Sequence, residues 1–478
     1  MAEVVQLKTD GGLINPDDPM ATARKFVKRY YTAPCELQTL VNHKETFLEY
    51  QGGQYHIRSK SNMRVALWRL LEKSRRAGDD SESGSSLIKP NTRMVNGILD
   101  ALEAVTAIDD VDTPFWLLPP PDSRFIANQM LVLSNGILHI PTKSLISHTP
   151  AYLTLSSSSA SFDATAPAPT QWLKFLDEVF TSDAEAIKTL QEFMGYCLTH
   201  DTRFQKIGFL HGPKRSGKGT IIRIMEHLLG ASATASMTMA SLSKDFGKQI
   251  LLGKMLATFP DARFGSAKDA NQIVESLLSI SGEDSVNIGR KFTSDWSGRL
   301  HCKFLIASND APEFQDSSGS LLSRFVVICT KRSFLNSEDL YLEGKLVTEL
   351  SGILNWALAG YSALYERSKF VLPTSSQPLI RTMEDSGSLV QAWLNRYAVL
   401  GQEEVAARSK VLNVWEHWCT EIRGMKSAPG AARLRIMLQS AVPGFDGDGG
   451  RPIIDGRRAY VYKGLRLKTA KELDADDA

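Results

Sequence analysis

The chain has 478 residues, of which 43% are hydrophobic and 23% are charged. This composition excludes an intrinsically disordered chain and is typical of a globular protein with roughly two to four domains. Because 55 Lys and Arg face 53 Asp and Glu, the formal net charge is only +2, and any basic surface must be local.

The cysteine pattern and the N-terminal sequence indicate the cellular compartment in which the protein is expected. None of the five cysteines belongs to a C-x-x-C pair, so the sequence predicts neither a zinc ribbon nor a disulfide framework. The first residues, MAEVVQLKTDGG, lack the features of a signal peptide, and no apolar run reaches the roughly 18 residues needed to span a bilayer. We therefore expect a cytoplasmic protein without a membrane partner.

The first third of the chain contains two polar stretches. We predict a mainly helical accessory region at residues 1–125, interrupted by the polar run 79–86, and then a hairpin and linker at 126–168. Within the latter, MLVLSNGILHI predicts a hairpin that turns at Asn135 and Gly136. The serine-rich run 156–169 has too little apolar surface to order itself and is expected to be a linker.

The region 169–375 has a different pattern. Amphipathic helices come first, with Trp172, Leu176 and Val179 on one face. From about residue 206 to 331, short β-branched runs alternate with helical segments, which predicts a parallel α/β sheet with helices on both faces. A helical tail and a Pro/Ser-rich segment separate it from a last unit at 376–478.

The stretch KIGFLHGPKRSGKGTIIRIMEHLLG places a glycine-bounded loop between an apolar strand and an amphipathic helix. This is the context of a phosphate-binding loop, in which backbone amides and the helix N-terminus surround phosphate oxygens and Lys218 adds a positive charge. Gly219 stands where Ser or Thr is usual, and Thr220 follows. The alternative is a glycine-rich turn with a surface lysine. The expected nucleotide contacts are Gly212, Pro213, Ser216, Gly217, Lys218, Gly219 and Thr220.

Polar residues follow three later strands. Asp261 ends one strand, where a carboxylate would help to hold magnesium together with Thr220. Asn309 ends another, where it would orient a water or the γ phosphate, and Arg324 precedes a fourth strand. Each also has a structural interpretation: a turn-starting aspartate, an Asx-turn cap and a solvated arginine at a helix end.

The ordered set GPKRSGKGT, GKMLATFPDAR, VESLLSISGEDSVNIGRKF and FLIASNDAPEFQDSSGSLLSRF resembles the successive motifs of the phage and plasmid primase-helicase family, in the superfamily 3 branch of the AAA+ ATPases. The resemblance extends from the hairpin near residue 135 to the C-terminus. It implies an AAA+-type fold, with ATP and Mg²⁺ bound at the phosphate loop.

The resemblance also implies roles for four residues. Lys218 would bind phosphates, Asp261 would be the Walker B acid, Asn309 the sensor, and Arg324 an arginine finger that acts on the ATP of a neighbouring subunit. A finger in trans requires a head-to-tail ring, expected to be a hexamer. The family often has a second acid beside the Walker B aspartate, which this chain lacks; Glu283 and Asp284 are weak candidates for that function.

Two segments are candidates for binding single-stranded or forked DNA. In SVNIGRKFTSDW, Arg290 and Lys291 lie near aromatic residues, and in the resembled family this region is a hairpin whose lysine contacts DNA. The alternative is an exposed basic turn. In the C-terminal unit, two helices and a hairpin around Asp455 suggest a winged helix, with Arg457 and Arg458 in a phosphate-contacting wing. Its alternative is a solvated strand face.

The acids Asp109, Asp110 and Asp112 could be mistaken for a nucleotidyl-transfer site, but no supporting acid or histidine accompanies them, and we expect them in a loop. The sequence therefore predicts a DNA helicase without priming activity, which works beside a separate primase or other replication proteins in a phage or mobile element. Two other functions stay open: a nucleotide-binding regulatory module without turnover, and a P-loop nucleotide kinase, against which the absence of arginine from 234–249 counts.

Overall fold

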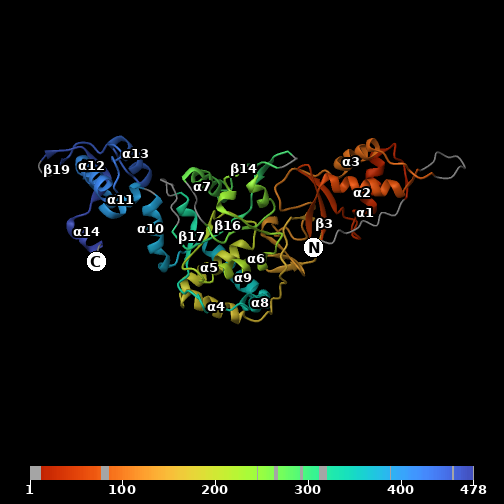
Figure 1. Cartoon of the computed structure of the whole chain (residues 1–478), viewed down its shortest axis with the longest axis horizontal. Helices are drawn as coiled ribbons and strands as arrows, with labels where there is room; N and C mark the ends of the chain where they lie inside the picture. Colours follow the sequence, from red (N-terminus) through yellow and green to blue (C-terminus); the bar gives the residue numbers. More distant parts are fainter. Residues whose placement is uncertain are drawn as a thin grey trace.

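The chain folds as three bodies arranged in a row, with the N-terminal body at one end and the C-terminal body at the other (Figure 1). No helix among the residues described below is both long and apolar enough to cross a bilayer. The computed structural model describes residues 12–76, 86–244, 246–262, 267–290, 294–311, 320–387, 389–454 and 457–476.

The N-terminal body combines three helices with an antiparallel sheet that the sequence analysis missed. Its strands are joined by tight turns at 44–45 and 52–53, and its helices share a core that contains Phe26, Leu67 and Leu102. Short pairings of β1 with β5 and of β6 with β10 complete it. The elements are α1 (Pro19–Tyr30), β2 (Leu40–His43), β3 (Thr46–Gln51), β4 (Gln54–Arg58), α2 (Lys60–Lys73), α3 (Thr92–Thr106), β1 (Leu13–Ile14), β5 (Arg75–Arg76), β6 (Phe115–Trp116) and β10 (Tyr152–Leu153).

The hairpin expected near residue 135 is present, but its turn is shifted by one residue. Because Leu133 pairs with Gly136, the two turn residues are Ser134 and Asn135, and Gly136 begins the second strand. A Cβ at Gly136 would lie 2.5 Å from the carbonyl oxygen of Ile146, so the close passage of a third strand requires glycine there. The strands are β7 (Met130–Leu133), β8 (Gly136–His139) and β9 (Ser144–Ile146).

The serine-rich run 156–169 is not a loose linker as expected. Ser156 and Ser158 are buried, and the Ser158 hydroxyl donates to the carbonyl oxygen of Leu228 at the end of helix α6 (Lys218–Leu229). Small polar side chains pack closely and satisfy carbonyls at the helix end, so this run is ordered without large apolar groups. The other polar run, 79–86, lies outside the described residues apart from Ser86.

The central body contains a five-stranded sheet with the order β12-β13-β16-β11-β17, in which every pair is parallel. The predicted α/β sheet is therefore present. Its strands are almost entirely buried, as is typical of a parallel sheet covered on both faces. They are β11 (Ile207–His211), β12 (Thr234–Ser236), β13 (Leu256–Phe259), β16 (Lys303–Ser308) and β17 (Phe325–Cys329).

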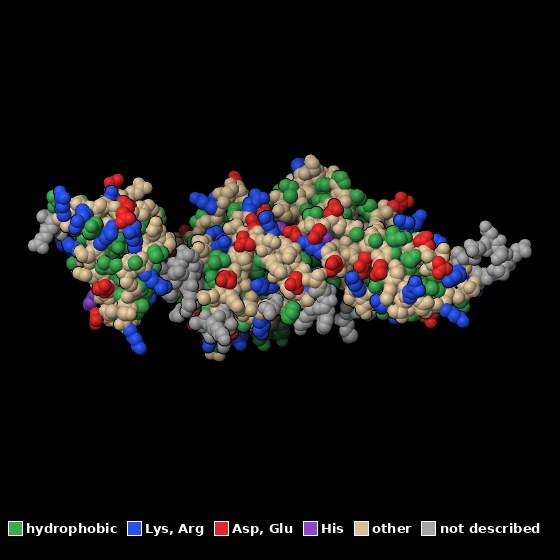
Figure 2. Space-filling model, turned by 90° about the horizontal axis from the view of Figure 1, so that it is seen from above, with side chains coloured by type: hydrophobic (Ala, Val, Ile, Leu, Met, Phe, Trp, Pro, Cys, Tyr) green, Lys and Arg blue, Asp and Glu red, His purple; other side chains and the backbone are tan. Residues whose placement is uncertain are grey.

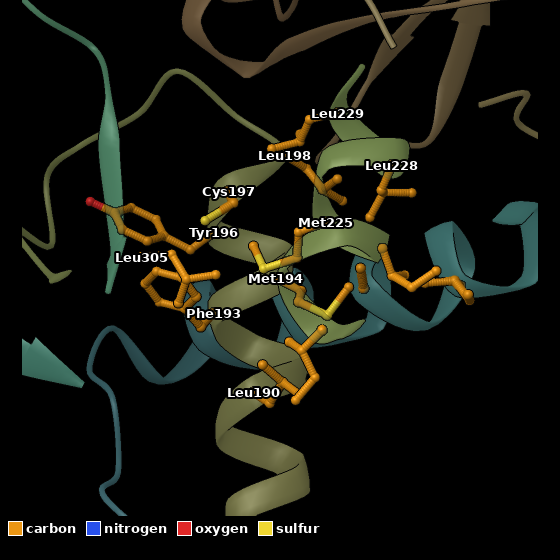
Figure 3. Packing of buried hydrophobic residues seen from close by; sticks show 14 of the residues in the cluster. Leu190, Phe193, Met194, Tyr196, Cys197, Leu198, Met225, Leu228, Leu229 and Leu305 are labelled. Atoms are coloured by element: carbon orange, nitrogen blue, oxygen red, sulfur yellow. The ribbon is translucent and has the colours of Figure 1, made fainter. Parts of the chain in front are cut away.

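Alternate residues of each strand contribute to separate cores on the two faces. On β16, Leu305 packs with the helices of one face, whereas Phe304 packs on the other face, where α7 lies. Glycine at position 195 allows helices α5 and α9 to approach closely, because a Cβ there would lie 2.3 Å from the backbone nitrogen of Tyr361. Part of this core is shown in Figure 3. The helices are α4 (Thr170–Phe180), α5 (Ala184–Cys197), α6, α7 (Ala267–Ser281), α8 (Leu342–Val347) and α9 (Leu350–Arg367).

The C-terminal body has its own core, built around Trp393, Trp415 and Leu438. Its elements follow in the order helix, strand, two helices and strands, and they include strand β18, which the sequence analysis missed. These elements are α11 (Leu389–Tyr397), β18 (Ala398–Ala407), α12 (Arg408–His417), a π-helical turn (Trp418–Ile422), α13 (Ala431–Ala441), β19 (Ile453–Ile454), β20 (Arg457–Arg458), β21 (Val461–Leu467) and α14 (Ala470–Asp476). The preceding helix, α10 (Gln377–Gly387), instead packs through Met383 against the core of the central body.

Candidate functional site

The loop between β11 and α6 is held in a shape that requires glycine. A Cβ at Gly212 would lie 2.1 Å from the Thr330 hydroxyl oxygen, and Gly217, with φ 88°, caps α6 in the left-handed region. The Ser216 hydroxyl lies 2.7 Å from that of Thr330. The loop is thus fastened to the end of the neighbouring strand β17.

Lys218 turns its side chain back into this loop. Its ammonium donates to the carbonyl oxygens of Gly212 (2.7 Å) and Pro213 (2.8 Å) and to the side-chain oxygen of Asn309 (2.9 Å). The residue is only 8% exposed, and burial lowers the pKa of its amine to about 8, although the charge of Asp261 opposes this shift. Lys218 is therefore a poorly solvated cation for which an anionic ligand would be favourable.

The structure brings Lys218, Asn309 and Asp261 to one edge of the sheet. Since β16 lies between β11 and β13, Asn309 at the end of β16 stands between the phosphate loop and Asp261, which follows β13. Asp261 is exposed. The carboxyl ends of parallel strands meet at one edge, so this juxtaposition follows from the topology.

A pocket of about 960 Å³ opens at this edge and is large enough for a nucleotide. Asp261, Asn309 and residues 216–220 line one part of it, and α4, α8 and residues 334–340 line the rest. Asp261 and Thr220 both line it and carry oxygen atoms, the ligand type that a hard divalent cation prefers. Gly212 and Pro213 are not among the lining residues but hold Lys218 through their carbonyl oxygens.

The unusual Gly219 has a local structural reason. A Cβ at this position would lie 3.2 Å from Nη1 of Arg223. The Arg223 guanidinium donates to the Thr220 hydroxyl (3.3 Å) and to Glu343 (2.6 Å), and this joins α6 to α8 at the lining of the pocket. A small residue at 219 leaves space for this arginine.

Arg324 lies at the opposite edge of the sheet from Lys218, because it precedes β17 whereas the phosphate loop follows β11, to which β17 is parallel. It is half-buried, not the freely solvated arginine of the alternative interpretation. Its Nη1 donates to the carbonyl oxygen of Leu278 (2.5 Å) and to the Ser281 hydroxyl (2.8 Å) at the end of α7. Arg324 therefore cannot reach the phosphate loop of its own chain.

Glu283 and Asp284, the weak candidates for polarising water, do not lie at the edge of the sheet that holds Lys218. Glu283 accepts a hydrogen bond of 2.5 Å from Thr202, which lies before β11. It thus belongs to the edge that holds Arg324, and Asp284 is its neighbour in sequence. The sheet separates both acids from Lys218.

The strand pair β14 (Ser285–Ile288) and β15 (Trp296–Arg299) forms the expected hairpin, and Lys291 lies outside the described residues. Arg290 donates to the carbonyl oxygen of Ser294 (2.8 Å) and to the Thr46 hydroxyl (3.2 Å). Lys44 donates to the carbonyl oxygen of Ser297 (3.1 Å). The hairpin is therefore attached to the N-terminal sheet, an arrangement that the sequence analysis did not anticipate.

The acids at 109–112 lie in a loop, as expected, and act in this attachment. The Asp112 carboxylate accepts hydrogen bonds from Lys44 (2.9 Å) and from the backbone N–H of Arg299 (3.3 Å). Asp110 lies 3.5 Å from Lys44. No cluster of three potential metal-ligating His, Cys, Asp or Glu side chains occurs in the described part of the chain.

In the C-terminal body, Arg457 and Arg458 form β20, which pairs with β19 around residues 455–456, themselves outside the described residues. Arg458 is exposed, and nothing is described of the Arg457 side chain. On the face seen in Figure 2, Lys and Arg side chains gather on this body (left) with carboxylates among them. Arg466 pairs with Glu472 (2.8 Å), so it is less available than the sequence alone indicates.

Sequence reasoning missed Arg408, the first residue of α12. Its guanidinium lies 5.3 Å from the ring centroid of Tyr460 and 5.2 Å from that of Tyr462, and it donates to Asp448 (3.0 Å). Hydrogen bonds from Arg435 and from Arg408 lower the pKa of the Asp448 carboxyl. A signal was present in the alternation of tyrosine and basic residues along 457–463, but the position of Arg408 beside it depends on the pairing of β18 with β21.

Comparisons with known proteins cover two parts of the chain. Residues 26–181 match a family model described as D5 N terminal like, and residues 210–324 match a family of unknown function, DUF5906. The second match includes Lys218, Asp261, Asn309 and Arg324. No curated protein matches the chain.

The solved structures of the NrS-1 C terminal region share the fold of almost the whole chain. The match to an A form apo structure includes 89% of this chain and 96% of the solved chain, with 10% sequence identity and a TM-score of 0.52. The match to a second A form apo structure, of residues 305–718, includes 94% of this chain and 100% of the solved chain, with 11% sequence identity and a TM-score of 0.51. At this identity the similarity concerns the fold.

Proposed function

We propose that the protein is an ATP-dependent ring helicase that translocates on single-stranded DNA and unwinds duplexes during the replication of a phage or mobile element. The observation that carries the proposal is the meeting of Lys218, Asn309 and Asp261 at one pocketed edge of a parallel sheet. The D5 N terminal-like segment and the resemblance of the ordered motifs to primase-helicases support the replication context.

The chain's own residues would act as follows. The Lys218 ammonium exchanges the carbonyl oxygens of Gly212 and Pro213 for phosphate oxygens of ATP, which keeps its hydrogen bonds and adds a charge pair. Asn309, released from Lys218, orients the γ phosphate or the attacking water. Thr220 and Asp261 would hold magnesium, which neutralises charge on the β and γ phosphate oxygens when bound.

Hydrolysis would need a second subunit. Arg324 faces away from the phosphate loop of its own chain, so its guanidinium is proposed to complete the site of a neighbour in a closed head-to-tail ring, which we take to be a hexamer. An arginine at a transferring phosphoryl group stabilises its charge and accelerates hydrolysis by about 10³ to 10⁵. This arrangement corresponds to a superfamily 3 AAA+ motor.

DNA would be contacted at two places. Arg290, which follows β14, and Lys291, the next residue in the sequence, are proposed to contact the phosphates of the translocating strand. Arg457 and Arg458 of a winged-helix-like C-terminal body are proposed to contact adjacent DNA. We propose no priming activity, so primers would come from a separate protein. Primer synthesis by the purified chain on a single-stranded template would contradict this part.

The test is ATP turnover by the purified chain with and without single-stranded DNA, combined with strand displacement on a forked duplex. The motor predicts turnover stimulated by DNA and displacement that Lys218→Ala abolishes. Phosphoryl transfer to a nucleoside monophosphate would instead indicate a kinase. Nucleotide binding without any turnover would indicate a regulatory module.

A further inference from the structure

One carboxylate joins two helices of the C-terminal body. Asp448 accepts a hydrogen bond from Arg408 at Oδ1 (3.0 Å) and one from Arg435 at Oδ2. Arg408 begins α12 and Arg435 lies in α13, so the two guanidiniums come from different helices. The Asp448 side chain is 69% exposed, and the two arginines therefore meet at an anion that faces solvent.

Arg408 is held in place independently of Asp448. Its Nε donates to the carbonyl oxygen of Val461 (3.3 Å), its Nη2 also donates to that of Gly447, and its guanidinium lies near the faces of Tyr460 and Tyr462. These contacts involve backbone and ring atoms, so they would remain if only the Asp448 side chain moved away. A guanidinium oriented in this way presents its remaining donors to an oxyanion with little loss of side-chain entropy.

The segment that carries Asp448 is paired with β21 on both sides of this residue, through the bridge of Asp446 with Lys463 and the hydrogen bond from the Val461 N–H to the Gly450 carbonyl oxygen (3.3 Å), so that only the side chain has to move to vacate the site. The segment has the sequence PGFDGDGG, in which Gly444 (φ 74°) and Gly450 (φ 86°) are so open that a Cβ at either position would meet no atom within 4 Å. Between them, a Cβ at Gly447 would lie 2.5 Å from Nε of Arg435. Glycine thus lets the backbone reach the arginines and change direction on both sides of Asp448.

The surroundings favour a polyanion over a small acid. Arg433, Arg451, Arg458 and Lys463 are exposed on the same body, and Arg451 lies 4.2 Å from the ring centroid of Tyr460. Exposed ion pairs contribute little to stability, so a phosphate could displace Asp448 at small cost. A row of phosphates would also contact the neighbouring cations.

We propose that Arg408 and Arg435 form a binding site for a phosphate of the nucleic-acid backbone, and that Asp448 fills it in the unbound chain as an internal competitor. The inference rests on the proposed function for the identity of its ligand. It differs from that function in assigning a site to α12 and α13, not to the β19–β20 hairpin.

The test compares Asp448→Asn with Glu403→Gln in the full chain. Glu403 is exposed on β18 of the same body, so the control removes the same charge without touching the arginines. Binding of a fluorescent oligodeoxythymidylate is measured by anisotropy over a range of salt concentrations. We expect Asp448→Asn to bind about three- to tenfold more tightly than the wild type, and the salt dependence to steepen by about one released counterion.

Two results would overturn the site: equal affinities of the two variants, including no binding by either, or a gain that survives in the Asp448→Asn/Arg435→Ala double variant. ATP turnover with the same oligonucleotide separates this inference from the proposed motor. DNA-stimulated turnover without tighter binding by Asp448→Asn removes the site and leaves the motor. Tighter binding without turnover supports the site and removes the motor.

Discussion

Nucleotide affinity should depend on pH through Lys218. In the free protein, burial lowers the pKa of this amine to about 8, whereas phosphates beside it would keep it charged. Above pH 8 the free amine is mostly neutral, so it must take up a proton when nucleotide binds. The affinity for nucleotide is therefore highest below pH 8 and decreases as the pH rises through this value.

The size of the effect follows from the pKa. At pH 7 about nine tenths of the free Lys218 amines are charged and at pH 9 about one tenth, so the dissociation constant should rise about tenfold between these values. The terminal phosphate titrates near pH 6 and does not contribute in this window. Binding at pH 9 should also take up close to one proton.

Isothermal titration calorimetry with a non-hydrolysable ATP analogue, in buffers of different ionisation enthalpy, measures both quantities. Lys218→Arg is the matched control, because its guanidinium stays charged and its affinity, whatever its value, should not change with pH. Circular dichroism at pH 7 and pH 9 verifies that the fold is unchanged. A wild-type dissociation constant that is constant from pH 7 to 9 would refute the reasoning.

Three further predictions concern other residues. Burial also lowers the pKa of Lys303 to about 8, so the unfolded chain binds more protons between pH 8 and 10 and wild-type stability should rise there. Lys303→Met should remove this rise and increase the free energy of unfolding at pH 7, measured in urea, by about 1–3 kcal/mol. A variant less stable than the wild type would contradict the prediction. Gly217→Ala should lower the free energy of unfolding by about 1–3 kcal/mol, because φ is 88° and the Cβ would lie 2.8 Å from Cγ2 of Val179. Gly219→Ala, with φ in the helical region, should lower it by less than about 1 kcal/mol. Equal melting temperatures of the two variants would contradict this. Arg324→Ala should keep ATP binding but slow hydrolysis by about 10³ to 10⁵, and mixing it with Lys218→Ala should restore some turnover. Full activity of Arg324→Ala alone would remove its assigned role.

The antiparallel sheet of the N-terminal body shows why part of the fold escaped prediction. Its first turn uses Lys44 and Glu45, both at positive φ (47° and 59°), a conformation that Asn and Gly usually adopt, so the residue types give no sign of it. The second turn is Gly52 and Gly53, a detectable signal that the sequence analysis did not use.

The C-terminal body shows a similar limit. In the sequence, Trp415, Trp418 and Ile422 recur at helical spacing, which predicts that they share one apolar face. Trp415 and Trp418 are buried, but Ile422 is 56% exposed. The helix changes to a π-helical turn from Trp418 to Ile422, which rotates the later residues away from the core. A periodicity of 3.6 residues cannot anticipate such a change.

Local sequence determined the phosphate loop, since Gly212, Gly217 and Lys218 need only the strand before them and the helix after them. Parallel topology was also readable, and it implied that Asp261 and Asn309 would reach the same edge as Lys218. Tertiary structure alone decided which residues became partners over long separations. The contact of Lys218 with Asn309, the opposite placement of Arg324 and the bridge from Asp448 to two helices all depend on strand order and docking, which neighbouring residues in the chain do not specify.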